Sequence, residues 1–134
     1  MIVVDASAIV ELLLRTPAGR RAEDRLLSRR DSLHAPHLLD VEVAQVLRRY
    51  AAAGELSPER GREALADLAD LPVQRYPHDA LLPRIWDLRQ NVTAYDAAYL
   101  ALAETLRAPL VTCDARLASA PGHDAKVEVL RARR

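Results

Sequence analysis

The sequence predicts an α/β protein of one domain over residues 1–134, with a mostly parallel central sheet flanked by helices on both faces. Short apolar or β-branched runs alternate with longer helical segments, which is the pattern of parallel sheets. The length of 134 residues suits a single domain, and no repeat or linker divides it. Half of the residues are hydrophobic while aromatics make up only 4%, so Leu, Val and Ala must build the core.

The chain opens with a buried strand over residues 1–4 that stops at Asp5, and a helix follows through Leu14. A strand that ends in a carboxylate and leads through small residues into a helix forms a ligand-binding turn in open α/β sheets. Capping of the helix explains Asp5 and Ser7 equally well, and their residue types leave both roles open.

The next elements are a helix over 16–29, a short strand over 33–36, and two helices over 37–53 and 57–71. Gly54 suits the left-handed turn that ends the first of these two helices. Both helices carry apolar residues on more than one side. We therefore expect the hairpin at about 37–71 to form a dimer or partner interface, or else to close the core of a monomer.

The second half begins with a strand over 72–76 and a helix over 78–90, irregular at Pro83. The rest is a helix from Thr93, a strand over 109–114, one helical turn over 115–118, a strand over 127–130 and a frayed tail over 131–134. Thr93 is a good N-cap and Asp96 suits the first turn of its helix. Asp96 is either a capping acid or a metal ligand, depending on which other carboxylates reach it.

Asp5 and Asp114 each follow a strand, and parallel strands end at the same edge of a sheet, so these two acids should meet. Topology alone places the start of the Asp96 helix near the other edge, unless the preceding loop reaches over. Asp40 and Glu42 are two residues apart on one helix, so only one of them can point into a given site.

Charge balance and cysteine content exclude some modes of binding and some types of site. The 19 basic and 19 acidic residues balance, which argues against nucleic-acid binding by bulk charge alone. A single cysteine, Cys113, excludes an intrachain disulfide and a cysteine-based zinc site. We also expect no membrane span and no signal peptide, hence an intracellular protein. The side chains that could touch a substrate are Arg15, Arg116 and the pair Arg48–Arg49, although ordinary solvated arginines explain them as well.

Four segments resemble the motifs of PIN-domain proteins, in the same order and spacing along nearly the whole chain. They are Met1-Ile-Val-Val-Asp5-Ala-Ser7-Ala, Leu38-Leu-Asp-Val-Glu42-Val-Ala, Thr93-Ala-Tyr-Asp96-Ala-Ala-Tyr and Leu110-Val-Thr112-Cys-Asp114-Ala-Arg-Leu. The chain is most similar to the VapC-type toxins of prokaryotic toxin–antitoxin pairs, which share its small single-domain size.

The resemblance implies a cytoplasmic endoribonuclease that acts as a toxin and uses Mg²⁺ or Mn²⁺. Its metal-binding and catalytic acids would be Asp5, Glu42, Asp96 and Asp114, with Ser7 and Thr112 as polar neighbours. The implied partners are RNA, a VapB-type antitoxin and a second copy of the chain in a homodimer. Carboxylates are hard ligands that suit these ions. Asp40 is then an outer helper or a surface charge, and Cys113 is a packed thiol.

Other readings fit less well. A receiver-type signalling domain needs paired acids after its first strand, whereas Ala6 follows Asp5, and the only lysine, Lys126, precedes the last strand. A haloacid-dehalogenase-like phosphatase needs an acid where Ser7 stands. We expect the four histidines to be structural or surface residues rather than catalytic ones. The remaining alternative is a catalytically silent PIN fold that binds RNA or protein, which the presence of all four acids disfavours.

Overall fold

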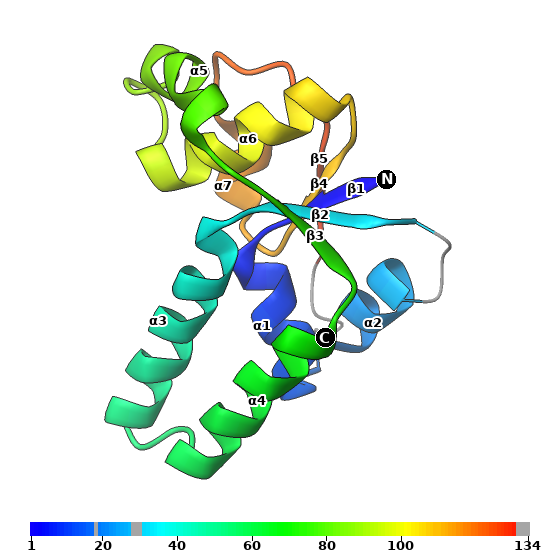
Figure 1. Ribbon diagram of the computed structural model, residues 1–134, viewed down its shortest axis with the longest axis vertical. Helices are drawn as coiled ribbons and strands as arrows, with labels where there is room; N and C mark the ends of the chain where they lie inside the picture. Colours follow the sequence, from blue (N-terminus) through cyan, green and yellow to red (C-terminus); the bar gives the residue numbers. More distant parts are fainter. Residues whose placement is uncertain (18, 28–30, 131–134) are drawn as a thin grey trace.

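The computed structural model describes residues 1–17, 19–27 and 31–130; the expected tail over 131–134 and the end of the helix expected over 16–29 lie outside them. In this part of the chain, five parallel strands form one sheet in the order β3-β2-β1-β4-β5 (Figure 1). The strands are β1 (Ile2–Val4), β2 (Leu33–Pro36), β3 (Val73–Tyr76), β4 (Leu110–Thr112) and β5 (Val127–Val129). The predicted fold class is therefore confirmed.

Helices cover both faces of this sheet. They are α1 (Ala6–Leu14), α2 (Gly19–Leu27), α3 (Leu38–Ala52), α4 (Pro58–Asp70), the 3₁₀ turn η1 (Asp79–Leu81), α5 (Leu82–Asp87), α6 (Ala94–Leu106) and α7 (Ala115–Ser119). Helices α1 to α4 gather on one face, α5 and α6 lie on the other, and α7 packs beside β5 (Figure 1). None of the helices in the described part is long and apolar enough to cross a membrane.

The core is aliphatic, as the composition requires. Strands β1 and β4 at the centre are buried along their whole length, and helix α6 crosses β1, β2 and β4. Every residue from Ala97 to Ala103 is buried. Four alanines in this stretch let α6 lie close to the sheet. This close packing fixes the start of α6, and with it Asp96, relative to the strand ends.

Helix α2 begins later than the sequence predicts. The expectation placed Pro17 in its first turn, whereas the helix starts at Gly19, whose N–H donates to Thr16 Oγ1 at 3.1 Å. A Cβ at Gly19 would lie 2.4 Å from the carbonyl oxygen of Glu11 in α1. Only glycine permits this approach of the two helices, which determines where α2 can begin.

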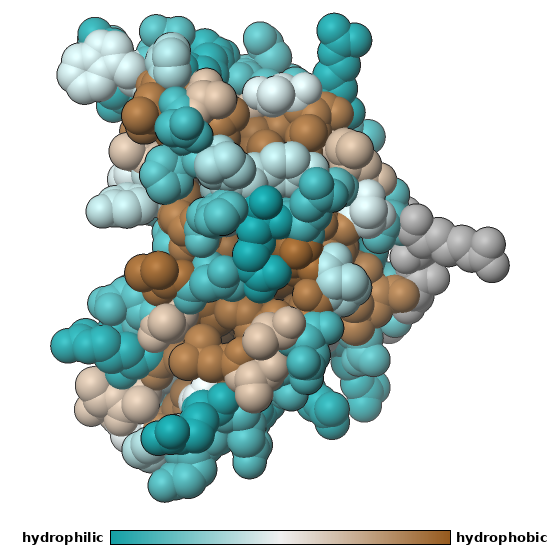
Figure 2. All heavy atoms as spheres, in the orientation of Figure 1, coloured by the Kyte–Doolittle hydropathy of each residue, from teal (hydrophilic) through white to brown (hydrophobic). Residues whose placement is uncertain are grey.

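The hairpin of α3 and α4 packs against α1, and Gly54 (φ 76°) follows the end of α3 in the left-handed conformation, as predicted. Leu39, Val43 and Leu47 turn into the core. Val41 remains 72% exposed and Leu65 on α4 39% exposed. Figure 2 shows apolar side chains gathered over this hairpin. The hairpin thus closes the core and also leaves apolar surface uncovered.

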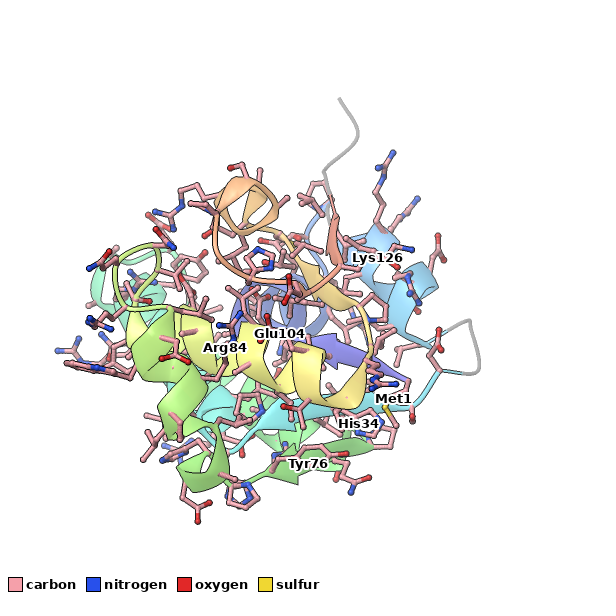
Figure 3. The ribbon with its side chains drawn as sticks, turned by 90° about the horizontal axis from the view of Figure 1, so that it is seen from above. Met1, His34, Tyr76, Arg84, Glu104 and Lys126 are labelled. Atoms are coloured by element: carbon pink, nitrogen blue, oxygen red, sulfur yellow. The ribbon has the colours of Figure 1, made fainter. Side chains whose placement is uncertain are left out.

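Two polar contacts fix the neighbouring elements. His34 on β2 is buried between the Ser32 hydroxyl at 2.7 Å and the Tyr76 hydroxyl of β3 at 2.6 Å, a structural role as expected (Figure 3). In addition, Arg84 of α5 forms a two-pronged ion pair with Glu104 of α6, with N–O distances of 2.8 and 2.9 Å (Figure 3). The helix predicted over 78–90 is instead divided into η1 and the shorter α5, and Pro83 lies in the first turn of α5.

Candidate functional site

The four predicted acids lie at the carboxyl ends of the strands. Asp5 follows β1, Glu42 lies in the second turn of α3 after β2, Asp96 lies in the first turn of α6, and Asp114 follows β4. They influence one another electrostatically: Asp96 raises the pKa of both Asp5 and Glu42, and Asp114 raises that of Asp96. Asp96 therefore lies within electrostatic reach of each of the other three acids.

The expectation that the Asp96 helix starts near the other edge of the sheet is wrong. Helix α6 leads directly into β4 and packs back across the sheet, so it runs antiparallel to the strands. Its N-terminus therefore lies above the carboxyl ends of the strands. The return direction of a crossover helix is enough to place Asp96 beside Asp5, without any excursion of the preceding loop.

Asp5 is held by a dense hydrogen-bond network at the ends of β1 and β4. Its Oδ1 accepts from Ser7 Oγ at 2.7 Å and from the Ala8 N–H at 3.1 Å, and its Oδ2 accepts from the Thr112 hydroxyl. In turn, Ser7 Oγ accepts from the Cys113 N–H and Thr112 Oγ1 from the Asp114 N–H. Both hydroxyls thus give their only proton to Asp5, which identifies them as its supports.

The environment of Asp5 has opposing effects on its charge. The carboxyl is only 7% exposed, and this burial raises its pKa above the usual value, assisted by the nearby charge of Asp96. The hydrogen bonds from Thr112, Ser7 and Ala8 act in the other direction. Burial has the larger effect, so the pKa of Asp5 is raised, and a nearby cation would stabilise its ionised carboxylate.

Glu42 points inward from α3 toward Tyr99 of α6. Burial raises the pKa of Glu42, and Asp96 and Asp5 raise it further, while the Tyr99 hydroxyl opposes them. Neither Glu42 Oε1 nor the Tyr99 hydroxyl, both buried, has a hydrogen bond of standard geometry within the described part of the chain. A buried oxygen without a partner is costly, so Glu42 is poised to accept a further ligand.

Asp96 is fixed by the start of its own helix. As predicted, Thr93 is the N-cap of α6, and its hydroxyl accepts from the Asp96 N–H at 3.2 Å. The side chain is half-buried. Burial raises its pKa, and the neighbouring Asp114 raises it further.

Asp114 differs from the other three acids. It is the N-cap of α7, accepting from the Arg116 N–H at 3.0 Å, and its carboxylate pairs with the Arg116 guanidinium at 2.7 Å. Arg116 holds the pKa of Asp114 below its usual value. The cluster therefore combines three acids that resist ionisation with one that a cation already neutralises.

This donor set fits a divalent cation. In residues 1–17, 19–27 and 31–130 no three acidic, His or Cys side chains are arranged to bind one ion together as they stand. However, the charge of Asp96 raises the pKa values of both Asp5 and Glu42, and Glu42 Oε1 is buried with no hydrogen bond of standard geometry in these residues. Hard carboxylate oxygens under mutual repulsion are what Mg²⁺ or Mn²⁺ relieves.

Two side chains near these acids, Asp40 and Cys113, have other roles than metal binding or catalysis. Asp40 turns away and forms a two-pronged ion pair with Arg75 of β3, with both N–O distances 2.8 Å, which makes it a surface charge. Burial raises the pKa of the Cys113 thiol to about 11, so it stays protonated and is a poor nucleophile. Tyr99 escaped the sequence analysis, although its place three residues after Asp96 on one helix face could have revealed it.

The PIN domain family model matches residues 2–122. Ribonuclease VapC12 of Mycobacterium tuberculosis is 44% identical over 130 residues, covering 97% of this chain and 99% of its own. Ribonuclease VapC1 of the same organism is 46% identical over 133 residues, covering 96% of this chain and 97% of its own. Among solved structures, VapBC2 from Rickettsia felis, bound to a DNA fragment from its promoter, contains a chain with a TM-score of 0.71 at 15% identity, covering 98% of this chain and all of that one.

Proposed function

The chain belongs to the PIN-domain family, and we propose that it is a metal-dependent endoribonuclease that acts as the toxin of a toxin–antitoxin pair. The observation that carries the proposal is the electrostatic coupling of Asp96 to Asp5, Glu42 and Asp114, all on elements at the carboxyl ends of the strands, with three of the four pKa values raised. The names of the two Mycobacterium tuberculosis relatives support the reaction and its substrate class, RNA.

The proposed cofactor is Mg²⁺ or Mn²⁺, held by Asp5, Glu42 and Asp96, with Asp114 joining them when Arg116 releases it. The chemistry that such a cation supplies is neutralisation of the phosphodiester charge and activation of a water molecule for hydrolysis. Ser7 and Thr112 hold Asp5 in one orientation. Glu42 Oε1 is buried and has no hydrogen bond of standard geometry within the described residues, so it can contribute an oxygen at small cost.

A PIN fold that only binds RNA or protein is the alternative. Such a protein has no need of the buried, mutually repelling carboxylates, which cost stability while nothing binds them. All four acids are present and clustered here, so we favour the enzyme.

Cleavage of total RNA, including tRNA and rRNA, tests the proposal. The purified protein should produce discrete cuts with Mn²⁺ or Mg²⁺ and none with EDTA or after Asp96→Asn. Asp40→Asn is the matched control, because Asp40 lies in an ion pair outside the cluster and its loss should leave cutting intact. Cutting that survives Asp96→Asn would reject the site, and no cutting with metal bound would favour a binding module.

We further propose that the protein is cytoplasmic, forms a homodimer and binds a VapB-type antitoxin through the α3–α4 hairpin, at about residues 37–71. The exposed Val41 and Leu65 support an interface there, as does a cavity of about 430 Å³ lined by Asp40, Leu65, Leu68, Ala69 and Arg75. The Rickettsia felis complex supports the type of partner. Light scattering checks the dimer: a mass near 15 kDa at micromolar concentration would contradict it.

A further inference from the structure

A groove opens beside Asp96, between the segment joining α5 to α6 and helix α7. It has a volume of about 470 Å³, and Asp96 and Thr93 lie on its wall. Arg89 and Arg116 also line it. A molecule that reaches Asp96 along this groove therefore passes two guanidinium groups.

Arg89 is held in place although it lies at the surface. Its guanidinium stacks on the Trp86 ring, 4.6 Å from the ring centre, and its Nη1 donates to the Trp86 carbonyl at 3.0 Å. Within the described residues it has no ion-pair partner, whereas Arg116 across the groove is paired with Asp114. Arg89 thus presents an uncompensated positive charge in a fixed position.

The charge of the site makes such a group necessary for an RNA substrate. The cluster is acidic and repels a phosphodiester backbone, and the whole chain has a formal net charge of zero, so general attraction does not offset this. The attraction must therefore come from individual cations close to the cluster. Arg89 has the required charge and position, and no acidic side chain among the described residues pairs with it.

We propose that Arg89, supported by Trp86, binds a backbone phosphate of a single-stranded RNA segment next to the bond that is cut, with this groove as the path of the strand. An unpaired strand lying in this groove reaches Asp96 beside Arg89, since both residues line it. This inference rests on the proposed ribonuclease function and adds its substrate-binding residue. Trp86 is a positioning residue, and the Arg84–Glu104 ion pair anchors the helix that carries it.

Binding of RNA tests this directly. Fluorescence anisotropy would use a labelled 20-nucleotide single strand of mixed sequence and its duplex, with Mg²⁺ present and with Asp96→Asn in every variant to prevent cleavage. Arg89→Gln should reduce the slope of log affinity against log salt by about 0.7, equivalent to roughly a fivefold loss at 0.1 M salt. Arg89→Lys should keep the slope, because it keeps the charge.

The role of Trp86 has its own readout. Trp86 is 66% exposed, so Trp86→Ala should leave the fold intact yet weaken binding to the single strand, and Trp86→Phe should restore it because a ring again supports Arg89. Arg62→Gln is the matched control, an exposed arginine on α4 across the sheet, and should bind like the background protein.

Three results would overturn the inference: unchanged affinity and slope in Arg89→Gln, an equal loss in Arg62→Gln, or a duplex that binds as tightly as the single strand. Cleavage separates these failures from failure of the proposed function. If the protein with native Asp96 cuts total RNA and Arg89→Gln leaves KM unchanged, only the groove is rejected. If the protein with native Asp96 and Arg89 neither cuts nor binds RNA with metal present, the ribonuclease function is rejected as well.

Discussion

Replacing Asp96 by Asn should make the metal-free protein more stable while strongly reducing its response to metal. Burial and the charge of Asp114 make the Asp96 carboxyl hard to ionise, so its negative charge at neutral pH costs folding free energy. An amide has nearly the same shape and no charge. The cap of α6 survives, because the bond to Thr93 uses the backbone N–H of residue 96.

The expected size of the metal response follows from linkage. A cation present at 100 times its dissociation constant stabilises the native state by about 2.7 kcal/mol. For 134 residues the entropy of unfolding near 60 °C is about 0.28 kcal/mol/K, so the wild-type Tm should rise by about 10 °C. With one carboxylate ligand missing, Asp96→Asn should show less than about a third of this rise at the same Mn²⁺ concentration.

Thermal unfolding followed by circular dichroism, with EDTA and then with Mn²⁺, measures both effects. Asp40→Asn serves as the control: it removes an acid from the same edge of the sheet but outside the cluster, and should retain the full rise. The reasoning is refuted if Asp96→Asn has a lower Tm than wild type in EDTA, or if its rise with Mn²⁺ equals that of wild type.

The same framework gives three further predictions. The stability advantage of metal-free Asp96→Asn should shrink as pH falls from neutral toward 4, because the raised pKa of Asp96 lets the native carboxyl take up its proton first; urea unfolding at several pH values measures this. Thr93→Ala removes the α6 cap and should cost about 1 kcal/mol in the same assay. Burial lowers the pKa of His34, so the unfolded chain binds a proton that the native state refuses, and stability should fall below about pH 6.5. His34→Gln should lose this part of the pH dependence.

The fold could be predicted from the sequence because its elements carry local patterns. Ile2–Val4 and Leu110–Thr112 are apolar and β-branched and become central buried strands, and the alanine-rich segment after Thr93 becomes the buried helix α6. The start of α2 was misplaced for a nonlocal reason. Close contact between Gly19 and the backbone of Glu11 sets it, and the local sequence carries no sign of that contact.

The site was predictable only in part. Asp5 and Asp114 follow parallel strands. The rule that parallel strands end at the same edge of a sheet is therefore enough to predict that these two acids lie near each other. Glu42 was chosen over Asp40 by resemblance to a family, and the structure gives the physical difference: Arg75 on β3 draws Asp40 away while Glu42 turns toward Tyr99. Arg89 was missed because its stacking on Trp86 and its place in the groove are tertiary features.

The four acids are supported unequally, and this bears on where binding energy arises. Asp5 keeps three hydrogen bonds and Asp114 keeps Arg116, so a cation that engages them must compete with interactions already made. Among the described residues, Glu42 Oε1 has no hydrogen bond of standard geometry to lose. The net gain on binding should therefore come mainly from Glu42 and Asp96, whereas Asp5 contributes a fixed position. Glu42 and Asp96 destabilise the metal-free protein, and relief of this destabilisation is thus the source of the affinity for metal.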